Sequence, residues 1–256
     1  MNCESYNRGG DNLNGYQNEF AFVMALNNKT KKELNPLLQD LIYFLFGNIP
    51  EDAVIKSWRN KEKQKEDILI KVNGMLKGIS IKMGSRNSVH VESIKSFVNF
   101  LKEMNVSKEN IDIFLNYQYA VDENNKKIDA EEYKKQHQKE IDQFNNAINK
   151  PEIIEAAIDR FVLKGNNSNY WIAAIVHGTP NDFVWLSKNN IVDVLMKNRN
   201  NYSTAIHFSN LVVQPMTRCL NENIKYLFGR KFIQVKWYSL YDDAIDCTSQ
   251  YIMEKE

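Results

Sequence analysis

The chain has 256 residues with 33 basic and 32 acidic side chains, so its net charge of +1 gives no global signature of a nucleic-acid-binding protein. Its cysteines, Cys3, Cys219 and Cys247, are odd in number and lack CxxC spacing, which argues against a zinc site or disulfide framework and favours a reducing compartment. The polar N-terminus and the lack of an apolar run of about 20 residues predict a soluble, cytoplasmic protein without a membrane partner.

The N-terminal part of the chain predicts an arm followed by two helices. Residues 1–14 are polar and rich in Gly and Asn, and we expect a loose arm there. The next segment predicts a helix with Phe20, Val23 and Met24 on one face. A second helix is predicted over residues 32–46, where leucines recur at helical spacing before a glycine ends the pattern.

Two short apolar runs predict a β-hairpin after a first strand at residues 54–58. Apolar residues alternate in residues 67–74 and again in residues 75–82, and Gly74 supplies the bend between them. This hairpin brings Asp67, at the start of one strand, near Lys82, at the end of the next. A carboxylate and a lysine at one sheet edge are groups that metal-assisted phosphodiester cleavage uses.

The remainder of the chain predicts helices followed by a mixture of strands and helices. A helix is expected to begin near Ser88, with Ser88 as its N-cap and with Val91, Ile94 and Phe97 in its buried stripe. Further helices are predicted at 107–119, 129–148, 151–164, 188–198 and 240–252, and strands at 170–176, 183–186, 202–208 and 232–237. The Gly/Asn-rich stretch at 165–169 fits either a loop within one domain or a domain linker.

The order of these residues resembles the PD-(D/E)xK nuclease superfamily. The matching features are Glu19 on an early helix, Asp67 opening the hairpin, and Ser80-Ile81-Lys82 closing it. The resemblance covers residues 16–104, and its motif is short and degenerate. It implies an α/β fold with a restriction-endonuclease-like core of helix, β-hairpin in a mixed sheet, and helix. Additional strands and helices would follow in residues 165–256, and the chain 1–256 would form a single nuclease domain.

The chain departs from the family motif at Ser80, where the second carboxylate is expected. One solution within the superfamily supplies this acid from the next helix, and Glu92 is placed for it. The resemblance then implies that Asp67, Glu92 and the backbone carbonyl of Ile81 ligate Mg²⁺. Lys82 would orient or deprotonate the attacking water. Glu19 would assist a metal-bound water or hold Lys82.

Each of these residues also has an ordinary structural interpretation. Asp67 could be a turn acid and Lys82 a solvated strand end, whereas Glu19 and Glu92 could be acids favoured near helix N-termini. The whole arrangement favours the nuclease interpretation more strongly than any one residue does.

Several polar residues are candidates for DNA contacts. Arg86 and Ser88 lie in an amide-rich loop suited to a phosphate, and His90 follows them. In the C-terminal half, Gln214 and Arg218 belong to a Gln-Pro-x-x-Arg run that resembles segments of some restriction enzymes. Side chains of the base-reading type also occur at Arg199, Asn200, Asn201, Gln234 and Lys236.

The function that these features favour is a Mg²⁺-dependent endonuclease acting on double-stranded DNA, of type II restriction character. The resemblance further implies a homodimer and a separate cognate DNA methyltransferase. Three alternatives stay open: a repair or defence nuclease on the same fold, a catalytically inactive DNA-binding protein, and a small-molecule hydrolase or transferase. The last has least support, because the sequence has no nucleophile elbow, no Gly-rich dinucleotide loop and no Ser/His/Asp arrangement that the spacing supports.

Overall fold

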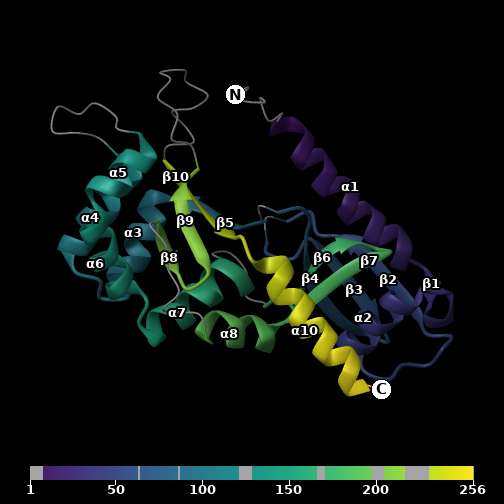
Figure 1. Cartoon of the computed structure of the whole chain (residues 1–256). Helices are drawn as coiled ribbons and strands as arrows, with labels where there is room; N and C mark the ends of the chain where they lie inside the picture. The colour runs from purple at the N-terminus through teal and green to yellow at the C-terminus, as the bar shows by residue number, and fades with distance from the viewer. Residues whose placement is uncertain are drawn as a thin grey trace. The chain divides into compact units, whose positions relative to one another are not determined.

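The computed structural model of the chain describes residues 8–62, 64–85, 87–120, 129–165, 171–197, 205–216 and 231–255 (Figure 1). The chain forms two compact units, each assembled from segments that are distant in the sequence. Unit 1 comprises Met1–Ser85, Leu163–Asn190 and Leu240–Glu256, and unit 2 comprises Arg86–Val162 and Ile191–Ser239. The predicted core of residues 16–104 therefore contributes to both units.

Unit 1 is built on a six-stranded sheet in the order β1-β2-β3-β4-β6-β7. All neighbouring strands are antiparallel except β4 and β6, which run parallel. The strands are β1 (Lys29–Thr30), β2 (Val54–Arg59), β3 (Ile68–Val72), β4 (Met75–Lys82), β6 (Ala174–Thr179) and β7 (Asp182–Ser187), and the helices are α1 (Arg8–Leu26), the 3₁₀ turn η1 (Lys31–Glu33), α2 (Pro36–Phe46) and α10 (Leu240–Lys255).

The predicted hairpin is confirmed as β3 and β4, with Ile68 opposite Ile79 and Val72 opposite Met75. Its loop consists of Asn73 and Gly74, both with positive φ, +47° and +84°. Two residues with positive φ form the turn whose twist matches antiparallel strands, and Asn-Gly favours it strongly. The hairpin register therefore follows from local sequence.

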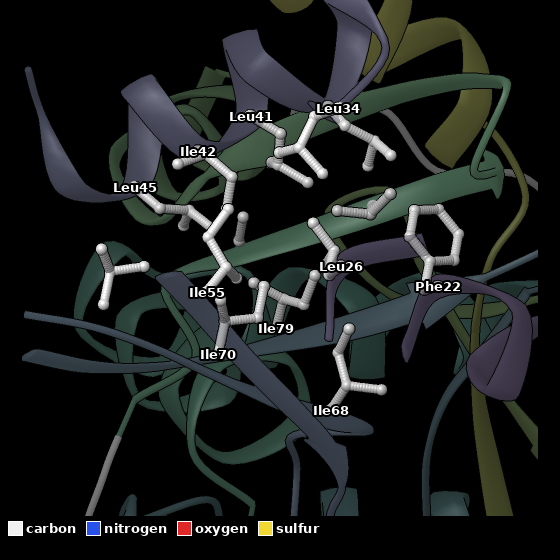
Figure 2. Close-up of a cluster of buried hydrophobic side chains, with 14 of the residues drawn as sticks. Phe22, Leu26, Leu34, Leu41, Ile42, Leu45, Ile55, Ile68, Ile70 and Ile79 are labelled. Carbon is white, nitrogen blue, oxygen red and sulfur yellow. The ribbon is translucent and has the colours of Figure 1, made fainter. Parts of the chain in front are cut away.

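The core of unit 1 lies where α1 and α2 cover one face of the sheet (Figure 2). Figure 2 shows α2 side chains, including Leu41 and Ile42, pointing toward Ile55 and Ile79 of the strands. Asn35 caps α2 by accepting a hydrogen bond from the N–H of Leu38 at 2.8 Å. In α1 the buried apolar side chains are Phe22 and Leu26. Of the expected apolar face, Val23 packs against this core, whereas Phe20 and Met24 are exposed.

Unit 2 contains a four-stranded antiparallel sheet in the order β5-β10-β9-β8. Its core is rich in aromatic side chains from the helices, the strands and the turn after α7: Phe97, Phe100, Phe114, Phe144, Phe161 and Phe208. Figure 1 shows α3, α4 and α6 beside this sheet. The elements are β5 (Asn87–Ser93), α3 (Ile94–Glu103), α4 (Lys108–Tyr119), α5 (Ala130–Gln136), α6 (Gln138–Ile148), α7 (Pro151–Ile158), β8 (Ile206–Phe208), β9 (Leu211–Pro215) and β10 (Phe232–Trp237). Helix α8 (Lys188–Lys197) spans the boundary between the segments of the two units.

The helix expected from Ser88 was wrong, because Asn87–Ser93 forms strand β5. The helix begins at Ile94, and its N-cap is Ser93, whose hydroxyl accepts a hydrogen bond from the N–H of Ser96 at 3.1 Å. Strand β5 pairs with β10, which lies more than 130 residues later in the chain. This remote partner satisfies the backbone of β5 and overrides the local helical spacing of apolar residues.

Three other sequence expectations also needed correction. Residues 8–14, expected in a loose arm, already belong to α1, which begins at Arg8. The helix predicted over 129–148 is divided at His137 into α5 and α6, and the one over 151–164 becomes α7 followed by a π-helical turn at Asp159–Leu163. Strand β9 was not expected at all. None of the helices within the described residues is long and apolar enough to cross a membrane.

The edge strand β8 is hydrogen-bonded by two asparagine side chains, one in α6 and one at its C-cap. Asn145 donates to the carbonyl of Ala205 at 2.9 Å and accepts from the N–H of His207 at 3.0 Å. Asn149, one turn later, donates to the carbonyl of His207 and accepts from the N–H of Ser209, both at 2.8 Å. The two amides thus take the place of a neighbouring strand, which covers the exposed hydrogen-bonding groups of a sheet edge.

Candidate active site

The candidate active site of unit 1 is centred on Asp67, which immediately precedes β3. Side chains alternate across β4, so Ser80 and Lys82 lie on the same face while Ile79 and Ile81 enter the core. Asp67 Oδ2 accepts hydrogen bonds from the Ser80 hydroxyl at 2.8 Å and from the backbone N–H of Ile81 at 2.6 Å. The hairpin therefore brings together the Asp67, Ser80, Ile81 and Lys82 that the sequence singled out.

Lys82 completes this cluster as its cationic member. Its Nζ lies 3.2 Å from Asp67 Oδ2 and 3.2 Å from the carbonyl oxygen of Ile81. The side chains of Lys82 and Asp67 are 20% and 24% exposed, so a ligand from solvent can reach both. Within the described part of the chain, all hydrogen bonds to the side-chain carboxylate of Asp67 fall on Oδ2, which leaves Oδ1 for another partner.

Glu19 of α1 places a second carboxylate in the electrostatic environment of Asp67. Burial and the negative charge of Asp67 raise the pKa of the Glu19 carboxyl, and the hydrogen bond and charge of Arg59 oppose this increase. Arg59 Nε donates to Glu19 Oε2 at 2.8 Å, so β2 fixes the orientation of this acid. The positive charge of Lys82 also acts to lower the Glu19 pKa.

The loop before Asp67 contributes two charged residues that sequence reasoning missed. Burial and the positive charge of Lys82 lower the pKa of Lys65 to about 7, although Asp67 acts in the opposite direction. Glu66 is buried against Gly78 of β4, where a Cβ atom would lie 2.3 Å from Glu66 Cγ. Nothing in the sequence distinguishes Lys65 from the other lysines of this charged loop, because only the fold brings it close to Lys82.

His177 of β6 is a third neighbour that the sequence did not indicate. It is the Cα partner of Lys82 in the parallel pair of β4 and β6. Its Nε2 lies 2.9 Å from the carbonyl oxygen of Gly84, which can only accept, so Nε2 carries the proton. The imidazole ring contacts the ring of Tyr241, with centroids 5.1 Å apart. The hydrogen bond from His177 to Gly84 thus stabilises the turn that follows Lys82.

Glu92, the expected second metal ligand, lies in unit 2 on strand β5. Its carboxylate receives two hydrogen bonds from Arg160, at 3.1 Å from Nε and 2.7 Å from Nη2, and His90 Nε2 lies 3.6 Å away. The Glu92 side chain is only 2% exposed. Burial raises its pKa, but hydrogen bonds from His90, Arg160 and Ser96 outweigh this effect and hold the pKa at about 2. A metal ion would have to displace Arg160 to use this carboxylate.

The predicted DNA-contacting residues divide into two groups. Ser88 and Gln214 are described, and both lie in unit 2, on β5 and β9, the two neighbours of β10. Arg86 and Arg218 lie outside the described residues, as do Arg199, Asn200 and Asn201. Within the parts of the chain that are described, no group of three or more His, Cys, Asp or Glu side chains is arranged to hold a metal ion.

The fold of the chain is similar to that of a solved structure, the restriction endonuclease MspI in complex with its cognate DNA. The TM-score is 0.54 and the sequence identity is 12%, over 91% of this chain and 93% of that chain. The sequence matches no known protein-family model and none of the curated proteins. At this identity the likeness concerns the fold alone, and it confirms the predicted restriction-endonuclease-like α/β fold.

Proposed function

We propose that this chain is a Mg²⁺-dependent endonuclease that hydrolyses phosphodiester bonds of double-stranded DNA at Asp67 and Lys82. The observation that carries this proposal is the convergence of Ser80, Ile81 and Lys82 on Oδ2 of Asp67. The other oxygen of this fixed carboxylate is left for a ligand, and the neighbouring Lys82 is reached by solvent. The similarity to a DNA-bound restriction endonuclease supports the same substrate class.

The residues at this site fit a magnesium ion. Mg²⁺ prefers oxygen ligands, keeps several waters, and often uses only one or two protein carboxylates together with substrate phosphates. Asp67 Oδ1 and the carbonyl oxygen of Ile81 are such ligands, and the hairpin brings them together, because Asp67 immediately precedes β3 and Ile81 lies on β4. When bound, Mg²⁺ would neutralise charge on the scissile phosphate and make a water molecule more acidic.

The protein side chains would then position the reactants. Lys82 would orient or deprotonate the attacking water, because its Nζ lies beside both proposed ligand groups. Ser80 would hold the Asp67 carboxylate in one orientation. Glu19, itself fixed by Arg59, would add negative charge to the same region and assist a bound water.

Ser80 also supports a second candidate, a DNA-binding protein that has lost catalysis. At the motif position where a second acid is expected, Ser80 has a neutral hydroxyl group. The carboxylate of Glu92 accepts hydrogen bonds from Arg160. Replacing Ser80 with Asp adds the acid back and separates these functions. If the wild type is inactive and Ser80→Asp gains cleavage, the protein is a nuclease that has lost its second acid. If the wild type cleaves DNA, the site needs no second acid at this position.

The finer aspects of the proposal concern biological context. We expect sequence-specific, type II restriction cleavage by a cytoplasmic homodimer, with a separate cognate methyltransferase protecting host DNA. Repair and defence nucleases on the same fold are the rival interpretation. Cleavage of plain duplex at a fixed sequence would separate restriction from repair.

The proposal is tested by incubating the protein with a mixed-sequence plasmid in the presence of Mg²⁺ or of EDTA. We expect discrete fragments from wild type with Mg²⁺ only, and none from Lys82→Ala. Lys77→Ala is the matched control, because Lys77 is an exposed lysine on the same strand. Activity of Lys82→Ala equal to that of the control would remove the active-site assignment.

A further inference from the structure

The outer face of the sheet in unit 2 carries polar side chains in a regular arrangement. In β10, the inward residues Ile233, Val235 and Trp237 are fully buried, whereas the alternate residues Gln234 and Lys236 are only partly buried. Polar residues on a strand that alternates in this way face solvent or a partner. Gln234 and Lys236 therefore mark the face of the sheet opposite the aromatic core.

The neighbouring strand β9 extends this polar face. Gln214 is the direct cross-strand partner of Gln234, so the two amides lie side by side. Tyr238 follows β10 and donates its hydroxyl proton to Gln214 Oε1 at 3.3 Å. The ammonium group of Lys236 lies over the ring of Tyr238, 6.0 Å from its centroid. Two amides, an ammonium group and a phenol thus form one continuous hydrogen-bonding surface.

On the other side of β10, an irregularity in β5 adds to the same face. The register between β5 and β10 shifts between Val235 and Lys236, so that Gln234 pairs with Val91 and Lys236 pairs with Ser88. Directly opposed residues share a face, which places Ser88 and Val91 outward. Glu92 pairs with the buried Ile233 and points inward to Arg160. The only carboxylate of β5 is thereby kept off the outer face.

We propose that this outer face of β5, β10 and β9 reads base edges in the major groove of duplex DNA through Gln214, Gln234 and Lys236. The proposal rests on the proposed function and identifies the part of the chain that selects the sequence to be bound. Strands β9 and β10 are the two middle strands of the four-stranded sheet, so Gln214, Gln234 and Lys236 would project from the sheet surface toward the groove, where each base pair presents its own pattern of donors and acceptors.

The spacing and chemistry of these side chains match base pairs. Alternate residues of a strand, such as Gln234 and Lys236, are separated by about 6.6–6.8 Å, and two base-pair steps span about the same distance. Gln can bond adenine at two atoms, and Lys can bond the acceptor edge of guanine. Protein partners are less well matched, because the centre of a protein interface is depleted in lysine and this face has Lys236 at its centre.

The test selects bound sequences from a pool of random duplexes and needs no cleavage. The Lys82→Ala protein is used, so that bound DNA stays intact, and Gln234→Ala and Lys236→Gln are added to it. Gln136→Ala is the matched control, because Gln136 is exposed on a helix of the same unit. Thermal melting of each protein shows that it is folded.

We expect the parent and the Gln136→Ala control to select the same consensus. Gln234→Ala should lower the preference at one base position about 5- to 100-fold while total affinity for random duplex changes much less. Lys236→Gln should change the preferred base at a second position.

An unchanged consensus in both folded variants, or a parent without sequence preference, would overturn the proposal. A shift in self-association with unchanged DNA selection would also overturn it and identify a protein interface. Plasmid cleavage by wild type is scored separately, so either proposal can fail alone.

Discussion

The two units each contain a carboxylate paired with a cation, and the two pairs are built differently. In unit 1, Asp67 and Lys82 are about one fifth to one quarter exposed, and a 3.2 Å contact joins them. In unit 2, Glu92 is 2% exposed and receives two hydrogen bonds from Arg160, as close as 2.7 Å. The pair in unit 1 is open to a ligand, and the pair in unit 2 is closed.

This difference is the reason why we propose a reactive site at Asp67 and a structural ion pair at Glu92. A planar guanidinium that binds a buried carboxylate through two atoms satisfies that group and leaves little capacity for a metal. Asp67 instead has its Oδ2 fixed by three donors while Oδ1 is left for a ligand. We therefore expect Asp67 to matter for activity and Glu92 to matter for stability.

The largest expected effect comes from Asp67→Asn. The substitution keeps an oxygen that can accept the bonds from Ser80 and Ile81, but it removes the charge that would bind Mg²⁺. Cleavage rates should fall by about a thousand-fold or more, with the melting temperature nearly unchanged. Asp52→Asn, at an exposed aspartate of the same unit, should have no effect on either. Cleavage by Asp67→Asn within ten-fold of wild type would exclude Asp67 as a ligand.

Glu92→Gln should show the opposite result. Removing one member of a buried ion pair leaves Arg160 uncompensated and typically costs about 3–5 kcal/mol of unfolding free energy. Urea or thermal denaturation should detect this loss, and cleavage below the melting temperature should continue. Glu152→Gln, at an exposed glutamate of α7, is the control. If Glu92→Gln instead abolished cleavage with unchanged stability, Glu92 would be the relocated metal ligand.

Acid should destabilise unit 2 in two steps. Burial lowers the pKa of His207 to about 4 in the folded chain, from 6.5 in the unfolded chain. Between these two pH values the unfolded chain binds a proton at His207 and the folded chain does not. The hydrogen bonds to Glu92 hold its pKa at about 2, so its contribution is complete above pH 4.5 and is lost as the pH falls toward 2. In both cases the unfolded state binds more protons, and stability decreases as pH decreases.

The size of each step is about 3 kcal/mol at most. Unfolding free energies measured between pH 7 and pH 2 should therefore decrease first below pH 6.5 and again below pH 4.5. In His207→Gln the first decrease should be absent, and in Glu92→Gln the second. A stability profile that is flat from pH 7 to pH 3 would contradict both assignments.

The smallest effect is expected from Asn149→Leu at the C-cap of α6. This change leaves the carbonyl of His207 and the N–H of Ser209 without their side-chain partner. The expected loss is about 2 kcal/mol of unfolding free energy, with faster hydrogen exchange at the Ser209 amide. Gln143→Leu, on an exposed position of the same helix, should leave both measurements unchanged. Equal protection of Ser209 in the two variants would show that the cap contributes little.

The parts of the site predicted from sequence are those fixed by neighbours along the chain. Asn73-Gly74 determines the hairpin turn and therefore its register, and the two-residue period of β4 puts Ser80 and Lys82 on one face. Asp67 then follows as their partner. Local turn chemistry and strand alternation carry enough information for this cluster.

Residues brought in by distant segments could not be predicted in the same way. His177 reaches Lys82 only because β6 pairs in parallel with β4, about 95 residues earlier in the chain. Segment Asn87–Ser93 has apolar residues that also fit a helix, and only the pairing with β10 makes it a strand and turns Glu92 toward Arg160. Sequence by itself determined the hairpin and its Asp67–Lys82 pair. Tertiary structure decided which of the two candidate carboxylates stays accessible, because burial and ion pairing depend on contacts between remote segments.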